Sequence, residues 1–278
     1  MAIITLSKGA FSGVEGLANQ LGDMLGYEVT SREQLLSTAA REFGVSKSEI
    51  QSALMHKPGF LEGRGLKKLH YVYCVQAAIA RAVQRDNVVY HGEAGHVLLA
   101  GIPHHLRVRV VGALDARIDA AMQQCDLPRE KAIQYLKELD EKRNTWLKWI
   151  HGVDMNDPAT YDLVINLERV PVSGAAGLVA ETARRDFPTT PASQKIVDDL
   201  VLASAVRAKI GLEPGVSDDR MQVAANDGVV IITTNVRYLA NADKVRELVS
   251  QLPGFRDIEF REGTQLKPSP LPRSAVRG

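Results

Sequence analysis

The chain has 278 residues, and its 34 Lys and Arg against 33 Asp and Glu give a formal net charge of +1 at pH 7. Because positive and negative charges nearly cancel, the net charge gives no reason to expect a nucleic-acid partner or binding to an anionic membrane, and we predict neither. No apolar run reaches the ~20 residues that span a bilayer, and the start lacks the basic segment of a signal peptide, so a cytoplasmic location is expected.

Strands alternate with helices along the first two thirds of the chain. Apolar, β-rich runs predict strands at 2–7, 27–30, 87–91, 106–112 and 161–167. Helical spacing and N-cap patterns predict helices at 13–26, 31–43, from 46 onward, 68–86, from 115 onward, 128–150 and 173–185, with a loop at 57–67. This alternation is typical of an α/β fold with a parallel sheet covered by helices on both faces. Such sheets bind ligands at the carboxyl ends of their strands.

Two prolines among small polar residues at 187–193 predict a linker, which separates a first domain at 1–186 from a second at 194–262. The second domain begins with a helix at 194–210. Strands are expected at 220–225 and 229–236, and Asn226-Asp227-Gly228 between them is a strong hairpin signal. A helix at 240–251 and a strand at 255–260 complete a small α/β unit. The last residues, 263–278, are expected to form a flexible tail.

The segment between the first strand and the first helix is rich in small residues. Backbone N–H groups in such a loop can surround an anion, and the helix N-terminus adds positive potential. We therefore expect a phosphate-binding loop at Ser7–Gly16, lined by Ser7, Gly9, Ser12, Gly13 and Gly16, with the Ser12 hydroxyl as a ligand for Mg²⁺. The alternative is a small-residue turn that binds nothing.

The loop departs from the standard P-loop pattern, G-x-x-x-x-G-K-[ST]. Val14 stands where the lysine is expected, and Glu15 adds a negative charge next to it. Lys8 is the nearest cation and either replaces the lysine in part or lies in solvent.

Five short motifs follow one another along the first domain. They are Ser7-Lys8-Gly9-Ala10-Phe11-Ser12-Gly13-Val14, Ser31-Arg32-Glu33, Val89-Tyr90-His91-Gly92-Glu93, Asp140-Glu141-Lys142-Arg143 and Tyr161-Asp162-Leu163-Val164-Ile165-Asn166. In these motifs and their order, residues 1–186 resemble the cytidylate kinase-like branch of the P-loop nucleoside monophosphate kinases. That branch often lacks the standard lysine. Glu93 stands where the family has an arginine, which reverses the charge at that point of the expected pocket.

The resemblance implies a P-loop NTPase-like sheet and transfer of the ATP γ-phosphoryl group, with Mg²⁺, to a nucleoside monophosphate such as CMP. Lys8, Arg117 and Arg143 would neutralise phosphate charge, and Arg32 would bind the substrate. For Arg143, on a charged helix that corresponds to the mobile lid, a solvated helix face is the alternative. The alternative for the whole chain is a pseudo-kinase that acts as a nucleotide sensor or scaffold, which Val14, Glu15 and Glu93 favour.

The C-terminal unit resembles a BON domain. Asn226-Asp227-Gly228-Val229-Val230-Ile231-Ile232 is similar to that domain's glycine-led hairpin, and Leu252-Pro253-Gly254-Phe255 to its second turn. Such domains bind phospholipids, small ligands or proteins, so the resemblance implies a protein or small-ligand partner there. The sequence leaves the oligomeric state open.

Overall fold

The computed structural model describes residues 1–55, 65–216 and 221–263, which form two compact units. The first unit contains Met1–Arg32, Asp86–Val97 and Pro103–Thr189, and the second contains Glu33–Arg85, Leu98–Ile102 and the chain from Thr190 on. The second unit thus takes residues from both sides of the linker expected at 187–193. Most of the loop expected at 57–67 and almost all of the tail expected at 263–278 lie outside the described residues.

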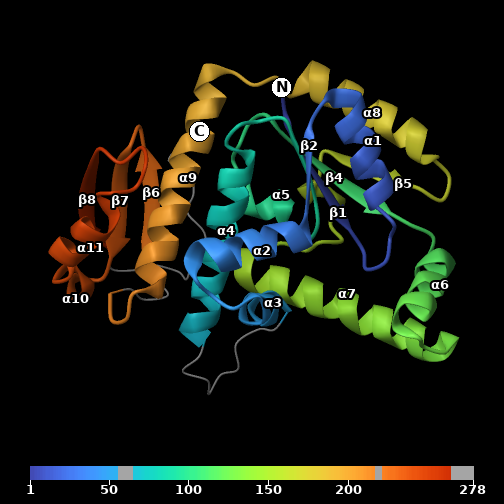
Figure 1. Ribbon diagram of the computed structural model, residues 1–278, viewed down its shortest axis with the longest axis horizontal. Coiled ribbons are helices and arrows are strands. Elements are labelled where there is room, and N and C mark those ends of the chain that lie inside the picture. Colours follow the sequence, from blue (N-terminus) through green and yellow to red (C-terminus); the bar gives the residue numbers. More distant parts are fainter. Residues whose placement is uncertain (56–64, 217–220, 264–278) are drawn as a thin grey trace. The chain divides into compact units, whose positions relative to one another are not determined.

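A five-stranded parallel sheet forms the centre of the first unit, with the strand order β2-β3-β1-β4-β5 (Figure 1). Its strands are β1 (Ile3–Lys8), β2 (Glu28–Ser31), β3 (Val88–His91), β4 (His105–Val111) and β5 (Leu163–Asn166). The α/β fold expected from the sequence is therefore confirmed. Because the strands are parallel, their carboxyl ends meet at one edge of the sheet, where β1 leads into the predicted phosphate loop.

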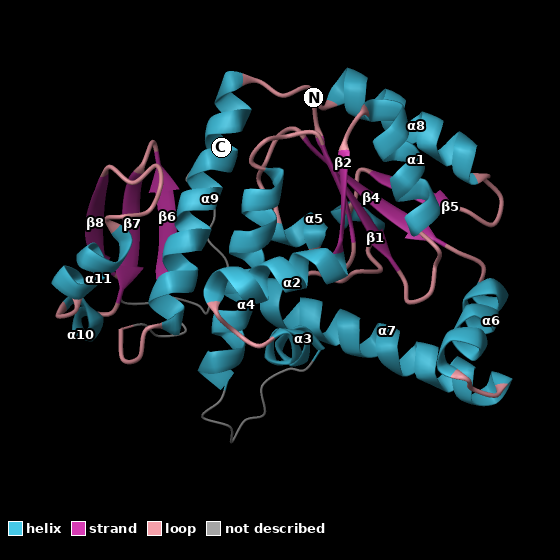
Figure 2. Cartoon of the chain, in the orientation of Figure 1, coloured by secondary structure: helices cyan, strands magenta, loops and turns pink. Residues whose placement is uncertain are grey.

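Helices connect these strands (Figure 2). They are α1 (Glu15–Leu25), α5 (Gly95–Leu98), α6 (Leu114–Cys125), α7 (Arg129–His151), the short 3₁₀ helix η1 (Pro158–Thr160) and α8 (Val172–Asp186). For most of these elements, the observed bounds differ by a few residues from those expected from the sequence. Gly26 and Gly152 end α1 and α7 in the left-handed conformation, which satisfies the last helical carbonyls.

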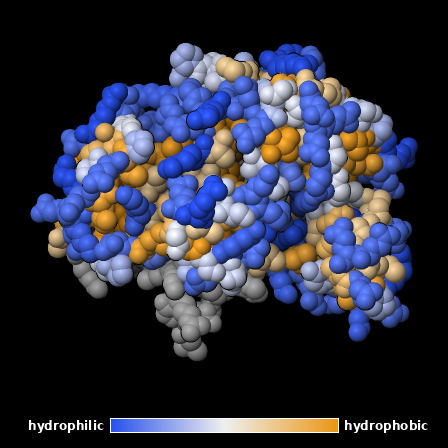
Figure 3. Space-filling view, viewed as in Figure 1, coloured by the Kyte–Doolittle hydropathy of each residue, from blue (hydrophilic) through white to orange (hydrophobic). Residues whose placement is uncertain are grey.

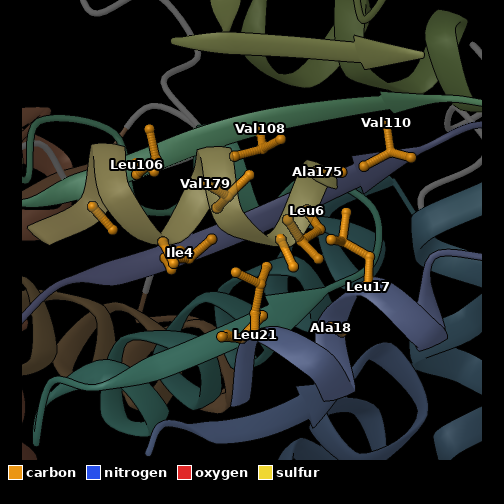
Figure 4. Close-up of a cluster of buried hydrophobic side chains, with 14 of the residues drawn as sticks. Ile4, Leu6, Leu17, Ala18, Leu21, Leu106, Val108, Val110, Ala175 and Val179 are labelled. Atoms are coloured by element: carbon orange, nitrogen blue, oxygen red, sulfur yellow. The ribbon is translucent and has the colours of Figure 1, made fainter. Parts of the chain in front are cut away.

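Aliphatic side chains from β1 and β4 pack against α1 and α8 on one face of the sheet (Figure 4). Ile4 and Leu6 come from β1, and Leu106, Val108 and Val110 from β4. These residues alternate along their strands, so the residues between them point to the opposite face. That opposite face of β4 carries Arg107 and Arg109, which matter for the site below.

Gly22 in α1 lies against β2 so closely that a side chain there would collide. A Cβ at residue 22 would lie 2.5 Å from Val29 Cγ2, whereas a Cβ at Gly16 in the same helix would meet nothing within 4 Å. We expect Gly22→Ala to lower the free energy of unfolding by about 1–3 kcal/mol through overpacking, and Gly16→Ala to raise it by about 0.4–1 kcal/mol. Urea unfolding of both variants tests this contrast, which equal shifts of the same sign would refute.

The second unit combines helices with a three-stranded sheet, in the order β6-β7-β8. Its elements are α2 (Arg32–Phe43), which begins at the last residue of the first unit, α3 (Lys47–Met55), α4 (Gly65–Val83), α9 (Pro191–Leu212), β6 (Gln222–Asn226), β7 (Val229–Thr234), α10 (Val236–Leu239), α11 (Ala242–Val249) and β8 (Asp257–Glu262). The predicted hairpin is confirmed: β6 and β7 pair antiparallel, and Asp227 and Gly228 between them have φ values of 54° and 78°.

Helices α4 and α9 pack along each other, although more than a hundred residues separate them in sequence. Arg207 of α9 is 2% exposed, and its guanidinium carbon lies 4.2 Å from the ring centre of Tyr73 in α4. Arg207 Nη2 also donates to the Tyr73 hydroxyl at 3.0 Å. The two helices are thus joined by a buried polar contact as well as by apolar packing.

Hydrophilic residues are spread over much of the face seen in Figure 3, and hydrophobic residues appear between them in smaller patches. In the part of the chain that the structure describes, no helix is long and apolar enough to cross a membrane.

Candidate functional site

The loop between β1 and α1 contains two residues in the left-handed conformation. Phe11 and Gly13 have φ values of 58° and 62°, in the left-handed region that non-glycine residues rarely adopt. Alternation of left- and right-handed residues directs successive N–H groups to one side, as in phosphate-binding nests. Ser12 Oγ donates to Gly9 O at 2.9 Å and so braces the turn from within.

Arg117 of α6 and Asp140 of α7 hold this loop. Arg117 donates from Nε to Ala10 O at 2.7 Å and from Nη2 to Asp140 Oδ2 at 2.5 Å. Asp140 Oδ1 in turn accepts the Ala10 N–H at 3.1 Å. Gly9 allows this approach, because a Cβ there would lie 3.0 Å from the Arg117 guanidinium carbon. Two sequence-predicted residues, Gly9 and Arg117, are therefore in contact.

Lys8 is paired within the loop region. Its Nζ lies 2.5 Å from Glu15 Oε1 at the start of α1. Burial acts to raise the pKa of Glu15, but the hydrogen bond and charge of Lys8, a backbone hydrogen bond and the charge of His91 together outweigh it and hold that pKa below its usual range. Glu15 is therefore ionised at neutral pH and neutralises the nearest cation of the loop.

Glu93 bridges two of the arginines that the sequence singled out. Its Oε2 lies 2.6 Å from Arg32 Nε and its Oε1 lies 2.6 Å from Arg143 Nη2, and all three side chains are 15–18% exposed. The expected charge reversal at residue 93 is thus a bridge between Arg32 and Arg143. Arg143 Nε and Nη1 are buried and have no hydrogen-bond partner among the described residues.

Ser7 lies in the protein interior at the end of β1. It is 3% exposed, and its Oγ lies 2.9 Å from His96 Nδ1. The His96 ring packs 4.7 Å from the ring of Tyr161. Burial, helped by His105, His151 and two arginines, lowers the pKa of His96 to about 3, so this imidazole is neutral at physiological pH.

Arg109 of β4 belongs to the same cluster and was not anticipated from the sequence. Its pKa is lowered chiefly by burial; Asp140 raises it, whereas Arg117 and Arg143 lower it further, so all three charges lie within its electrostatic reach. The signal that could have found it is the alternation in β4, where Val108 and Val110 enter the core. The cluster contains four arginines and two carboxylates, so its net charge is +2, which favours an anionic ligand. These residues are Arg32, Arg109, Arg117, Arg143, Glu93 and Asp140.

Comparisons of the sequence with a family profile and with known proteins point to one family. The profile of the cytidylate kinase-like family matches residues 3–169 and leaves the C-terminal unit unassigned. A cytidylate kinase of Methanothrix thermoacetophila is 25% identical over 183 residues, which span 66% of this chain and 98% of the relative. A cytidylate kinase of Haloarcula marismortui is 27% identical over 169 residues, which span 60% and 81%.

Among solved structures, an uncharacterized protein from Eubacterium ventriosum matches 66% of this chain and 98% of its own, with 16% identity and a TM-score of 0.48. The shikimate kinase of Bacteroides thetaiotaomicron matches the same shares with 10% identity and a TM-score of 0.42. The family profile covers more than half of the chain and includes the loop and the bridging Glu93. The chain therefore belongs to the cytidylate kinase-like family.

Proposed function

We propose that this protein binds ATP with its phosphates at the loop Ser7–Gly16 and transfers the γ-phosphoryl group to a nucleoside monophosphate such as CMP. One observation carries the proposal: arginines from α2, α6 and α7 converge beside a turn that can surround an anion, at the carboxyl edge of a parallel sheet. Phosphoryl transfer depends mainly on positioning and charge neutralisation, which such a cluster supplies.

The residue roles that we propose are those that the family resemblance implies. Lys8, Arg117 and Arg143 neutralise charge on the transferring group, and Arg32 binds the acceptor. The residues that hold the phosphates are Ser7, Gly9, Ser12, Gly13 and Gly16. Ser7 acts from beneath the loop, because its hydroxyl is already bound to His96.

Magnesium fits this site as an ion shared with the nucleotide. In residues 1–55, 65–216 and 221–263, no group of three His, Cys, Asp or Glu side chains could hold a metal by itself. Mg²⁺ in kinases takes only one or two protein oxygens and keeps phosphate and water ligands. The lone pairs of Ser12 Oγ, which donates its proton to Gly9 O, are suited to that role. When bound, the ion would neutralise phosphate charge.

The second candidate function is a catalytically degenerate pseudo-kinase that senses a nucleotide or acts as a scaffold. The observation that favours it is the pairing of Lys8 with Glu15 and of Arg143 with Glu93, which uses cations that catalysis needs. Its output would come from a BON-like domain at 194–262, following a kinase-like domain at 1–186, with a protein or small ligand as partner.

The deciding experiment measures phosphoryl transfer from Mg-ATP to a panel of nucleoside monophosphates. We expect turnover on one acceptor and a loss of about 10³-fold in Arg143→Ala. Arg129→Ala is the matched control, since Arg129 begins the same helix but is half exposed and pairs with Asp115 and Asp119. No turnover on any acceptor, with Mg-ATP still bound, would favour the sensor. No ATP binding would refute the kinase and leave the scaffold.

Neutralising Glu15 tests whether the loop is the phosphate site. We expect Glu15→Gln to bind Mg-ATP more tightly, because it removes a negative charge at the loop and releases Lys8. The change should be modest, since the Glu15 side chain is 55% exposed and solvent screens its charge. Calorimetric titration of the variant and the wild type measures it, and an unchanged affinity would exclude this loop as the site.

A further inference from the structure

Arg109 carries a largely buried positive charge that forms no ion pair among the described residues. It lies on β4, mostly buried, and its Nη1 has no hydrogen-bond partner among the described residues. No carboxylate of the described residues lies within ion-pairing distance of Arg109. Its guanidinium carbon lies 6.0 Å from the centre of the Tyr161 ring. A guanidinium stays protonated even where burial lowers its pKa. A buried charge without a partner is costly, so its presence calls for an anion.

Arg107, two residues earlier on the same face of β4, shows what a structural arginine looks like here. Asp162 accepts from Arg107 Nη2 at 2.7 Å and from Nε at 3.0 Å, and also from the Arg107 N–H at 2.8 Å. Its charge is fully matched within the protein. The two arginines therefore share a strand and a face and differ in whether the chain supplies a counter-charge.

The sheet register places Arg109 next to the phosphate loop. Residue 109 is the direct partner of Ser7, and the following pair is Lys8 with Val110. Paired residues of neighbouring parallel strands point to the same face, so Arg109 flanks the last strand residues before the loop.

The loop cannot supply this charge from its usual position. Val14, where the family pattern of P-loops has lysine, is completely buried in the core against α8. Lys8 is paired with Glu15, and Arg117 with Asp140. Among the described residues that bear on this edge, Arg109 is therefore a cation without an ion-pair partner.

We propose that Arg109 binds a phosphate of the bound nucleotide and provides the positive charge that other P-loop kinases take from the loop lysine. This inference rests on the proposed function, because it assumes that a nucleoside polyphosphate occupies the loop. It adds a residue that no motif in the sequence indicated and assigns it a phosphate-binding role.

The test compares Arg109→Ala, Arg109→Lys and Arg107→Ala in the full chain, with Mg-ATP and uncharged adenosine as probes in calorimetric titrations. We expect Arg109→Ala to weaken Mg-ATP binding about tenfold or more, the usual effect of losing one charged hydrogen bond, and to leave adenosine binding unchanged. Arg109→Lys should recover part of the ATP affinity. Arg107→Ala should bind Mg-ATP like the wild type.

Thermal unfolding without ligand separates this role from a structural one. Loss of an uncompensated buried charge should leave the Tm of Arg109→Ala unchanged or raise it, whereas Arg107→Ala should lower it. Wild-type ATP affinity in Arg109→Ala, or an equal loss of ATP and adenosine binding, would overturn the inference and leave the proposed function standing. A wild-type protein that binds no Mg-ATP would instead overturn the proposed function.

Discussion

Tyr73→Ala is expected to lower the free energy of unfolding by about 4 kcal/mol, within the range for removing a buried aromatic ring. Tyr73 is completely buried, and its ring and hydroxyl both contact the guanidinium of Arg207. The substitution leaves a cavity and also strips a buried cation of its aromatic face and its acceptor. The packing of α4 on α9 therefore depends strongly on this side chain.

Tyr73→Phe is the matched control, because it keeps the ring and removes only the hydroxyl. Its cost should be about 1–3 kcal/mol, the penalty for a buried donor left without its acceptor. Denaturation of both variants is best followed by tryptophan fluorescence and by circular dichroism. Fluorescence reports on the first unit, because Trp146 and Trp149, the two tryptophans of the chain, lie on α7 there, whereas Tyr73 lies in the second unit. Circular dichroism should show the lower unfolding midpoint, and an unchanged transition in Tyr73→Ala would contradict the predicted role.

Glu93→Gln is expected to destabilise the protein by about 3 kcal/mol, at the lower end for a broken buried ion pair because the three side chains keep some exposure. One neutral amide cannot replace a carboxylate between Arg32 and Arg143, and the two guanidiniums then repel each other. The same change removes the carboxylate that competes with a ligand anion for Arg143.

Added tripolyphosphate should therefore raise the Tm of Glu93→Gln more than that of the wild type, since an anion that binds only the folded state stabilises it. Glu138→Gln is the control, because Glu138 lies on α7 in an exposed pair with Lys142 at 3.9 Å. Equal tripolyphosphate shifts in wild type and Glu93→Gln would show that Glu93 does not compete with a ligand.

Local pattern was enough to predict the turns that form within one stretch of chain. The small residues after β1 predicted the loop, and Asp227-Gly228 predicted the hairpin, because both depend on backbone conformations that few residues adopt. Family resemblance singled out Arg32 and Arg143, and the structure brings them to one carboxylate.

Contacts between distant segments could not be predicted in this way. In the sequence, Glu93 is a negative charge where the family has an arginine. Only the fold shows that Glu93 forms ion pairs with Arg32 and Arg143. The position of Arg109 in the site could not be predicted, because an arginine in a strand is indistinguishable from a surface residue in the sequence alone. The structure shows that its neighbours Val108 and Val110 enter the core on the other face. The packing of α4 on α9 has no local signal, since it depends on tertiary contact between helices far apart in sequence.

The path of the chain between its two units has a consequence for how such a protein can be shortened or rearranged. The chain passes from one unit to the other after residues 32, 85, 97, 102 and 189. A chain that stopped at residue 189 would keep α4 but lose α9, and would leave the buried ring of Tyr73 in water. We expect such a fragment to aggregate. Over evolution, the C-terminal segment could therefore be lost only if α4 changed with it.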